Sequence, residues 1–155
     1  LAYPKGLTEV HFIKLELKDR TGRILSENFY WRGTSYMNYT ALAKMGKANL
    51  TGKATIDKRD SLTVMKVTLS NNNSGMAVMV RLKLLKKETG KRVLPVFYED
   101  NYISLVPGES KTIHINFEDK DLGIEEPQLM IEGWNQQEKE IPISKAIISS
   151  HKLSQ

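Results

Sequence analysis

The stretch YEDNYISLVPGES, from Tyr98 to Ser110, decides the fold because it turns the chain twice between extended segments. The side chains of Asp100 and Asn101 can hydrogen-bond their own backbone and hold a sharp turn. An extended run restarts at Tyr102 and ends at Pro107-Gly108, a dipeptide typical of a second turn. We therefore interpret residues 100–102 as a structural corner between two β-strands, with the ring of Tyr102 packed against a core.

Apolar and polar residues alternate along most of the chain, which is the pattern of half-buried β-strands. Ile13, Leu15 and Leu17 alternate with lysine and glutamate, and we expect these three side chains to face the core. The sequence DRTG at 19–22 is a hairpin turn signal that leads into a second strand over Ile24 to Trp31.

The same alternation predicts the later strands and their inward faces. The inward residues are Met65, Val67 and Leu69, then Val78, Val80, Leu82 and Leu84, then Ile113, Ile115 and Phe117, and finally Leu129 and Ile131. A turn at Glu88-Thr89-Gly90 leads into an expected strand over Val93 to Tyr98. About eight strands at short spacing predict an all-β sandwich of antiparallel sheets.

One segment departs from the alternation. Between Met37 and Gly46, Asn38 or Thr40 can cap a helical turn and Gly46 can end it. We expect one short helical crossover there, bridging the two sheets at one end.

The chain length of 155 residues, with 40% hydrophobic residues, suits one core. We expect a single β-sandwich domain over 1–155, with its core at about 7–143 and a frayed tail at 144–155. The chain begins at Leu1 without Met or a signal segment, so we expect it to be excised from a larger multidomain protein.

Composition excludes several classes of function. The chain has no Cys, so disulfides, thiol catalysis and Cys-ligated metals are absent, and the compartment is left open. No apolar run approaches the roughly 20 residues of a membrane span, so we expect no membrane insertion. Residues 1–92 carry 18 Lys and Arg against 7 Asp and Glu, but these charges are spread over strand positions without stacking aromatics. We therefore expect no nucleic-acid binding.

The sequence shows no catalytic constellation. The closest acidic pairs are Glu99-Asp100, Glu118-Asp119 and Glu125-Glu126, all in expected turns where adjacent carboxylates point apart. The histidines, His11, His114 and His151, lack partners at metal-ligand spacing. We expect no catalytic residue, no metal and no cofactor in this chain.

Two tryptophans are candidates for a contact surface because aromatic rings stack on sugars and anchor interfaces. Trp31 shares strand parity with Phe29, which favours packing in a core. Trp134 lies opposite Ile131 in parity and is expected to be exposed. Trp134 and Asn135 are therefore our candidate contact residues, and we favour a domain-docking role over sugar binding.

Three phrases in order carry a resemblance to a known family: ENFYWRG at 27–33, DNYISLVPGE at 100–109 and EGWN at 132–135. Over roughly Leu7 to Ile143 the chain resembles the C-terminal immunoglobulin-like β-sandwich of family 2 glycoside hydrolases, in the β-mannosidase and exo-β-D-glucosaminidase branch. In that family the acid and nucleophile lie on a separate barrel domain. The resemblance therefore implies a non-catalytic accessory domain.

The parent implied by this resemblance is a retaining glycosidase that hydrolyses a terminal β-mannoside or β-glucosaminide. The partners of this chain would be the catalytic barrel and the sandwich domains of the same polypeptide, with carbohydrate as a further possible partner. A periplasmic or extracellular parent is favoured over a cytoplasmic one. Two alternatives stay open: an independent carbohydrate-binding module, and a cell-surface sandwich for protein interaction.

Overall fold

The computed structural model describes residues 5–35 and 38–145. The chain divides after Gly46 into two compact units, a smaller one that contains a β-hairpin and a larger one that contains the sandwich.

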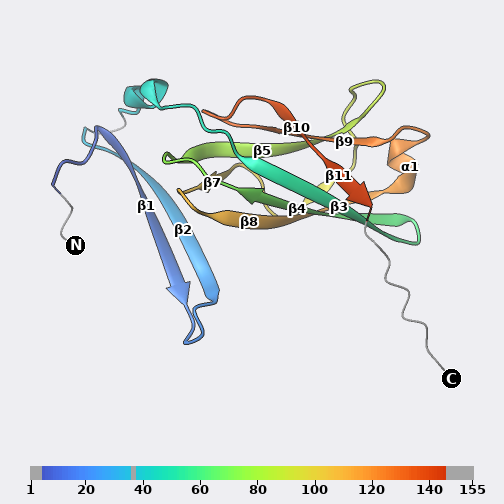
Figure 1. Ribbon diagram of the computed structural model, residues 1–155, viewed down its shortest axis with the longest axis horizontal. Helices are drawn as coiled ribbons and strands as arrows, with labels where there is room; N and C mark the ends of the chain where they lie inside the picture. Colours follow the sequence, from blue (N-terminus) through green and yellow to red (C-terminus); the bar gives the residue numbers. More distant parts are fainter. Residues whose placement is uncertain (1–4, 36–37, 146–155) are drawn as a thin grey trace. The chain divides into compact units, whose positions relative to one another are not determined.

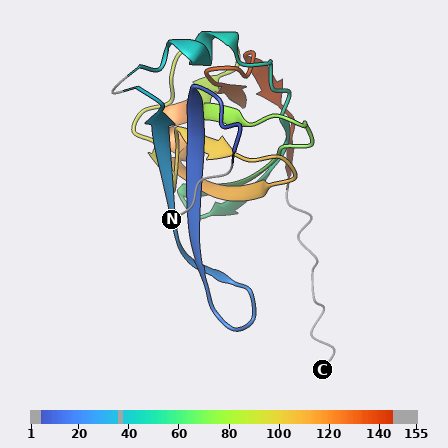
Figure 2. The ribbon, with the colours of Figure 1, turned by 90° about the vertical axis from the view of Figure 1, so that its left-hand side faces the viewer.

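The first unit is built on one long β-hairpin, drawn in blue in Figure 1. Strands β1 (Val10–Lys18) and β2 (Ile24–Gly33) pair antiparallel as a two-stranded sheet of their own. Asp19 holds the turn, since its Oδ1 accepts hydrogen bonds from the backbone N–H of Thr21 at 2.9 Å and of Arg23 at 3.0 Å. Figure 2 shows the two strands running side by side to this turn. The expected hairpin is confirmed.

The expected inward face of this hairpin is wrong. Leu15 is 50% exposed and Leu17 is 61% exposed. Burial instead concentrates near the open end of the hairpin, where Phe12 stacks on Phe29 at 5.5 Å between ring centroids and meets the edge of Trp31 at 5.6 Å. Alternation predicted the strand correctly, but it does not tell whether a second sheet covers the apolar face.

The expected helical turn is present as a short 3₁₀ helix, η1 (Thr40–Lys44). It follows β2 of the hairpin and precedes β3 (Thr51–Arg59), so it does not connect the two sheets of the sandwich as expected. Asn38 Oδ1 accepts hydrogen bonds from the backbone N–H of Thr40 at 3.1 Å and from its hydroxyl at 2.8 Å. The tip of the expected segment around residue 37 lies outside the described residues.

The second unit contains two sheets. The five-stranded sheet has the order β11-β3-β4-β8-β6, and the four-stranded sheet has the order β10-β9-β5-β7 (Figure 1). The strands of the first sheet are β3 (Thr51–Arg59), β4 (Leu62–Ser70), β6 (Phe97–Tyr98), β8 (Ser110–Glu118) and β11 (Ile143–Lys145). Those of the second are β5 (Ala77–Lys86), β7 (Ile103–Leu105), β9 (Pro127–Glu132) and β10 (Lys139–Ile141). A four-residue helix, α1 (Asp119–Leu122), follows β8.

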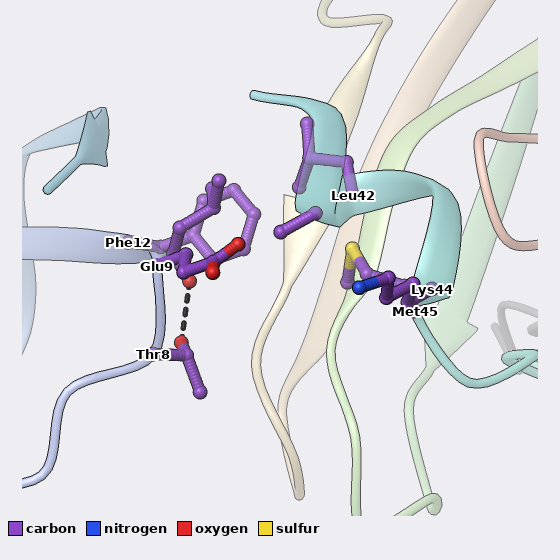
Figure 3. Close-up of a pocket in the computed structure, with 8 residues that line it drawn as sticks. Thr8, Glu9, Phe12, Leu42, Lys44 and Met45 are labelled. Atoms are coloured by element: carbon purple, nitrogen blue, oxygen red, sulfur yellow. Dashed lines mark hydrogen bonds between the residues drawn. The ribbon is translucent and has the colours of Figure 1, made fainter. Parts of the chain in front are cut away.

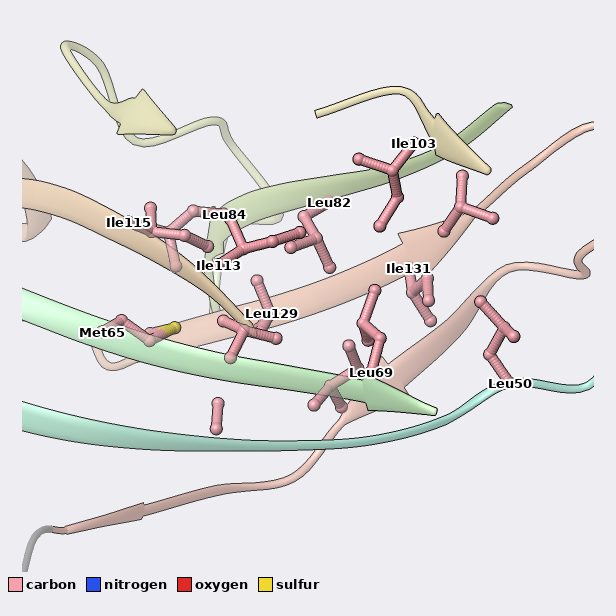
Figure 4. Close-up of a cluster of buried hydrophobic side chains, with 14 of the residues drawn as sticks. Leu50, Met65, Leu69, Leu82, Leu84, Ile103, Ile113, Ile115, Leu129 and Ile131 are labelled. Atoms are coloured by element: carbon pink, nitrogen blue, oxygen red, sulfur yellow. The ribbon is translucent and has the colours of Figure 1, made fainter. Parts of the chain in front are cut away.

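The core of the sandwich includes most of the inward residues predicted from alternation, together with others, such as Leu50 and Ile141, that were not predicted. Met65, Val67 and Leu69 of β4 are fully buried, as are Leu129 of β9 and Ile115 of β8. Figure 4 shows Met65, Leu69, Ile115 and Leu129 gathered in one cluster with Leu82 and Leu84 of β5. The all-β immunoglobulin-like sandwich is thereby confirmed. The described residues hold eleven strands, nine in the sandwich and two in the hairpin, where about eight were expected for the whole chain.

Two boundaries differ from expectation. The strand expected over Val93 to Tyr98 is reduced to β6, because Pro95 has no N–H to donate to a ladder. Strand β11 extends paired structure into the expected tail, since it pairs parallel with β3 from Ile143 to Lys145. The remainder of the expected tail, with His151, lies outside the described residues.

Candidate docking surface

The corner at residues 100–102 completes one edge of strand β5. Along this edge β7 pairs with β5 only at Ala77 and Val80. Beyond that point the side chain of Asn101 takes over: its Oδ1 accepts from the Leu82 N–H at 2.8 Å and its Nδ2 donates to the Leu82 carbonyl at 3.2 Å. Asp100 Oδ1 accepts from the Asn101 N–H at 2.8 Å and steadies the turn. The amide of Asn101 thus substitutes for a strand.

Tyr98 extends the same edge, a role that the sequence analysis missed. Its hydroxyl accepts the Leu84 N–H at 3.0 Å, and burial raises the pKa of Tyr98. The signal was present, because Tyr98 begins the same corner phrase and follows an expected strand. Its ring packs against the core, which is the position that we had assigned to Tyr102.

The expectation that the Tyr102 ring packs against the core is wrong. Tyr102 is 56% exposed and its φ is +58°, so its side chain leaves the alternation of a strand. The Arg81 guanidinium lies 5.8 Å from the centroid of this ring, and Arg81 Nη1 donates to the Tyr102 hydroxyl at 3.1 Å. Because Asn101 already closes the edge of β5, Tyr102 turns outward and lies over Arg81.

Trp134 and Asn135 lie on the opposite edge of β5 and play different roles. Asn135 Oδ1 accepts the Val78 N–H at 3.0 Å, and its Nδ2 donates to the Met76 carbonyl at 2.8 Å. Asn135 is therefore bound to the strand and mirrors Asn101. The Trp134 N–H donates to the Val78 carbonyl at 2.9 Å, while the side chain is 55% exposed.

Five side chains around the middle of β5 form a surface that we name the β5 patch. They are Met79, Arg81, Tyr102, Glu132 and Trp134. Met79 is 40% exposed with φ at +50°, in a β-bulge between Ala77 and Val80 that redirects its side chain. Arg81 joins the patch, because it pairs with Glu132 on β9 and with Tyr102 beside β7. Tyr102 and Trp134 thus flank the same strand, β5, from opposite edges.

The charges of the β5 patch neutralise one another. The Glu132 carboxylate accepts from Lys83 Nζ at 2.9 Å and from Arg81 Nε, and these hydrogen bonds lower the pKa of Glu132. Lys83 also donates to Glu138 at 2.5 Å, and the two glutamates raise the pKa of Lys83. Such a carboxylate is held ionised, which suits a fixed recognition surface and opposes a general-acid role.

The acidic pairs considered from the sequence are each engaged with their own partners. Glu99 binds His114 Nδ1 at 2.7 Å, which lowers the pKa of Glu99. Lys58 donates to Asp119 at 2.6 Å and lowers the pKa of Asp119. Asp100 pairs with Lys111 at 2.8 Å, and Glu125 accepts the Thr89 N–H at 2.9 Å. The remaining two, Glu118 and Glu126, pair with Lys120 and Lys87. These carboxylates cap turns and form ion pairs.

A hollow of about 480 Å³ lies within the first unit (Figure 3). Its lining is mainly apolar, and consists of Thr8, Glu9, Val10, Phe12, Ala41, Leu42, Lys44 and Met45. Across residues 5–35 and 38–145 no three His, Asp or Glu side chains are arranged to hold a metal ion. In the same part of the chain no helix has the length and apolar character to cross a membrane.

Comparison with known protein families shows which family the chain belongs to. Residues 28–136 match the model of the exo-β-D-glucosaminidase Ig-fold domain. The chain belongs to this family. Within it, the chain is 33% identical over 154 residues to an exo-β-D-glucosaminidase of Arthroderma benhamiae and 30% identical over 157 residues to one of Streptomyces avermitilis.

Solved structures agree with this family of Ig-fold domains. The crystal structure of the Amycolatopsis orientalis exo-chitosanase CsxA superposes with a TM-score of 0.79 at 28% identity and covers 92% of the chain. The matched region makes up 19% of that protein. The match to the Arthroderma relative includes 84% of this chain and 16% of the relative, and the match to the Streptomyces relative includes 88% of this chain and 17% of the relative. It therefore spans about a sixth of the length of these multidomain relatives.

Proposed function

We propose that this chain is a non-catalytic accessory domain of a longer retaining glycoside hydrolase that acts on terminal β-linked hexosides. Membership of the family supports this proposal, together with the small share of each relative that the chain spans. The names of these relatives favour a β-glucosaminide as the parent's substrate over a β-mannoside. The partners are then the catalytic barrel and the sandwich domains of the same polypeptide, outside the cytoplasm.

The observation that carries the proposal is the engagement of the carboxylates. The adjacent acidic pairs cap turns or bind lysines and His114, whereas a retaining mechanism needs two carboxyl groups about 5 Å apart in one cleft. The match to the family model includes residues of both units, from β2 to Gln136, which supports treating the chain as one accessory module.

The β5 patch is the docking surface within this proposal. Trp, Tyr, Met and Arg are the residue types enriched in the centres of protein interfaces, and here they lie around one strand. Trp134 and Tyr102 supply exposed rings, and the ion pairs of Glu132 hold Arg81 in place. Interfaces between domains of one chain bury on the order of 600 to 1,500 Å², which a patch of this kind can anchor.

Two assays test the proposal. The purified chain should show no turnover of aryl β-glucosaminide or β-mannoside, while the full polypeptide should hydrolyse one of them. Turnover by the chain that disappears in Glu99→Ala or Asp100→Ala would overturn the non-catalytic assignment. A gene that encodes no catalytic barrel would overturn the parentage.

The second assay concerns the patch, because exposed Trp134 and Tyr102 also suit the alternative of carbohydrate binding. We expect no saturable binding of chito- or manno-oligosaccharides by fluorescence titration. In the full polypeptide, Trp134→Ala should speed proteolytic release of this domain, and Phe97→Ala, which removes another exposed ring, should not. Micromolar saccharide binding that is lost in Trp134→Ala would instead favour the carbohydrate-binding module.

A further inference from the structure

The hairpin of the first unit is long and paired along its length, but no third strand of the described residues joins its sheet. Strands β1 and β2 pair from Val10 with Gly33 to Lys18 with Ile24, yet they form a sheet of only two strands. An isolated two-stranded hairpin is marginally stable in water, and stable sheets need further strands or packing against another element. A ribbon of this length therefore needs cover on at least one face.

The two faces of the hairpin differ in character. On one face, aromatic rings pack near the open end and charges pair toward the turn: Lys14 Nζ lies 3.2 Å from Glu16 and 3.3 Å from Glu27. Lys18 reaches Glu16 at 2.7 Å. The charges of this face are therefore paired within β1 and, through Lys14 and Glu27, across the two strands.

The opposite face, on which His11 and Arg32 lie near the open end, carries an apolar row that we name the aliphatic face. It consists of Ile13, Leu15 and Leu17 of β1 with Tyr30 of β2, which lies directly across from Ile13. Leu15 is 50%, Leu17 61% and Tyr30 48% exposed. Their cross-strand neighbours Asn28 and Ser26 are short and polar, so the two leucines stand out as a ridge along β1. A contiguous row of this kind on a soluble protein marks an interaction site.

We propose that the aliphatic face docks on another domain of the same longer polypeptide. This inference rests on the proposed function, since the relatives devote more than four fifths of their length to other regions. The match to the family model begins at residue 28, within β2, so β1 lies outside the matched residues. Strand β1 and its ridge belong to the separate two-stranded sheet and to neither sheet of the sandwich.

A tethered domain is the favoured occupant over a second copy of the chain. Two domains joined by a short linker have an effective concentration in the millimolar range for binding each other. A free second copy of the chain is present at a lower concentration.

Hydrogen exchange at residues 10–33 tests this docking in both the full polypeptide and the 155-residue chain. We expect the hairpin amides to exchange at least tenfold more slowly in the full polypeptide. Leu15→Ser with Leu17→Ser should abolish that protection. Leu62→Ser, which alters a leucine that is 40% exposed in the sandwich, should leave it unchanged.

Three other results would overturn the inference, and the first two would identify what contacts the aliphatic face instead. Equally slow exchange in the isolated monomeric chain would show that another part of the same chain contacts the aliphatic face. Protection that rises with the concentration of the isolated chain would show that a second copy of the chain contacts the aliphatic face. Fast exchange in a full polypeptide that does hydrolyse a β-hexoside would refute only the docking, whereas a gene without a catalytic barrel would remove the proposed function as well.

Discussion

Replacing Asn101 with Ala removes the side chain that substitutes for a strand along β5. Two hydrogen bonds to Leu82 are lost, one from its N–H at 2.8 Å and one to its carbonyl at 3.2 Å. Leu82 is only 3% exposed, so its main-chain groups have little access to water in the native state. Leaving a buried polar group unsatisfied costs about 1 to 3 kcal/mol.

For two such groups, partly rescued by water entering the space of the missing amide, we expect a loss of roughly 2 to 4 kcal/mol in the free energy of unfolding. Urea denaturation followed by circular dichroism and by tryptophan fluorescence measures this loss. The matched control is Asn72→Ala, which removes an exposed amide with one long bond of 3.4 Å to Thr51 and should change stability by less than about 0.5 kcal/mol. If Asn101→Ala costs no more than Asn72→Ala, the amide does not support the edge of β5.

Three further outcomes follow from the same contacts. Tyr102→Ala should cost less than about 1.5 kcal/mol, because an exposed ring over Arg81 contributes little, whereas a loss of about 3 to 5 kcal/mol would place that ring in the core. Tyr98→Phe should cost about 1 to 3 kcal/mol, since it leaves the buried Leu84 N–H without its acceptor. Glu132 has a pKa lowered by Lys83 and Arg81, so its stabilising effect is present above its ordinary pKa of about 4.3 and is lost as pH falls through its lower folded-state pKa. Glu132→Gln should therefore destabilise the chain at pH 7 and have little effect at the lowest pH at which it stays folded. A difference between the two proteins that is independent of pH would contradict the ionic origin.

The sandwich was predictable because its inward residues follow one simple rule. Val80, Leu82 and Leu84 of β5 lie in the core cluster as predicted, and Val78 is also buried. The same rule misplaced Leu15 and Leu17, because the alternation of one strand carries no information about what covers it. Local pattern cannot reveal tertiary context of this kind.

The candidate site was only partly predictable for a related reason. The exposure of Trp134 agrees with its strand parity. Tyr102 does not follow parity, because a residue with positive φ leaves the strand geometry on which parity depends. Met79 and Arg81 were not singled out, since their place in the patch depends on a β-bulge and on pairing with β9, and neither has a sequence signature.

The lengths of the outermost strands have a consequence for aggregation. Both sheets of the sandwich end in very short strands: β7, β10 and β11 have three residues each, and β6 has two. Short edges give another chain little backbone to pair with, which protects a β protein from edge-to-edge assembly. The hairpin has no such protection, since both of its strands, of nine and ten residues, are edges of their sheet. Outside a longer polypeptide, the hairpin is therefore where fibrous or amorphous assembly of this chain would begin.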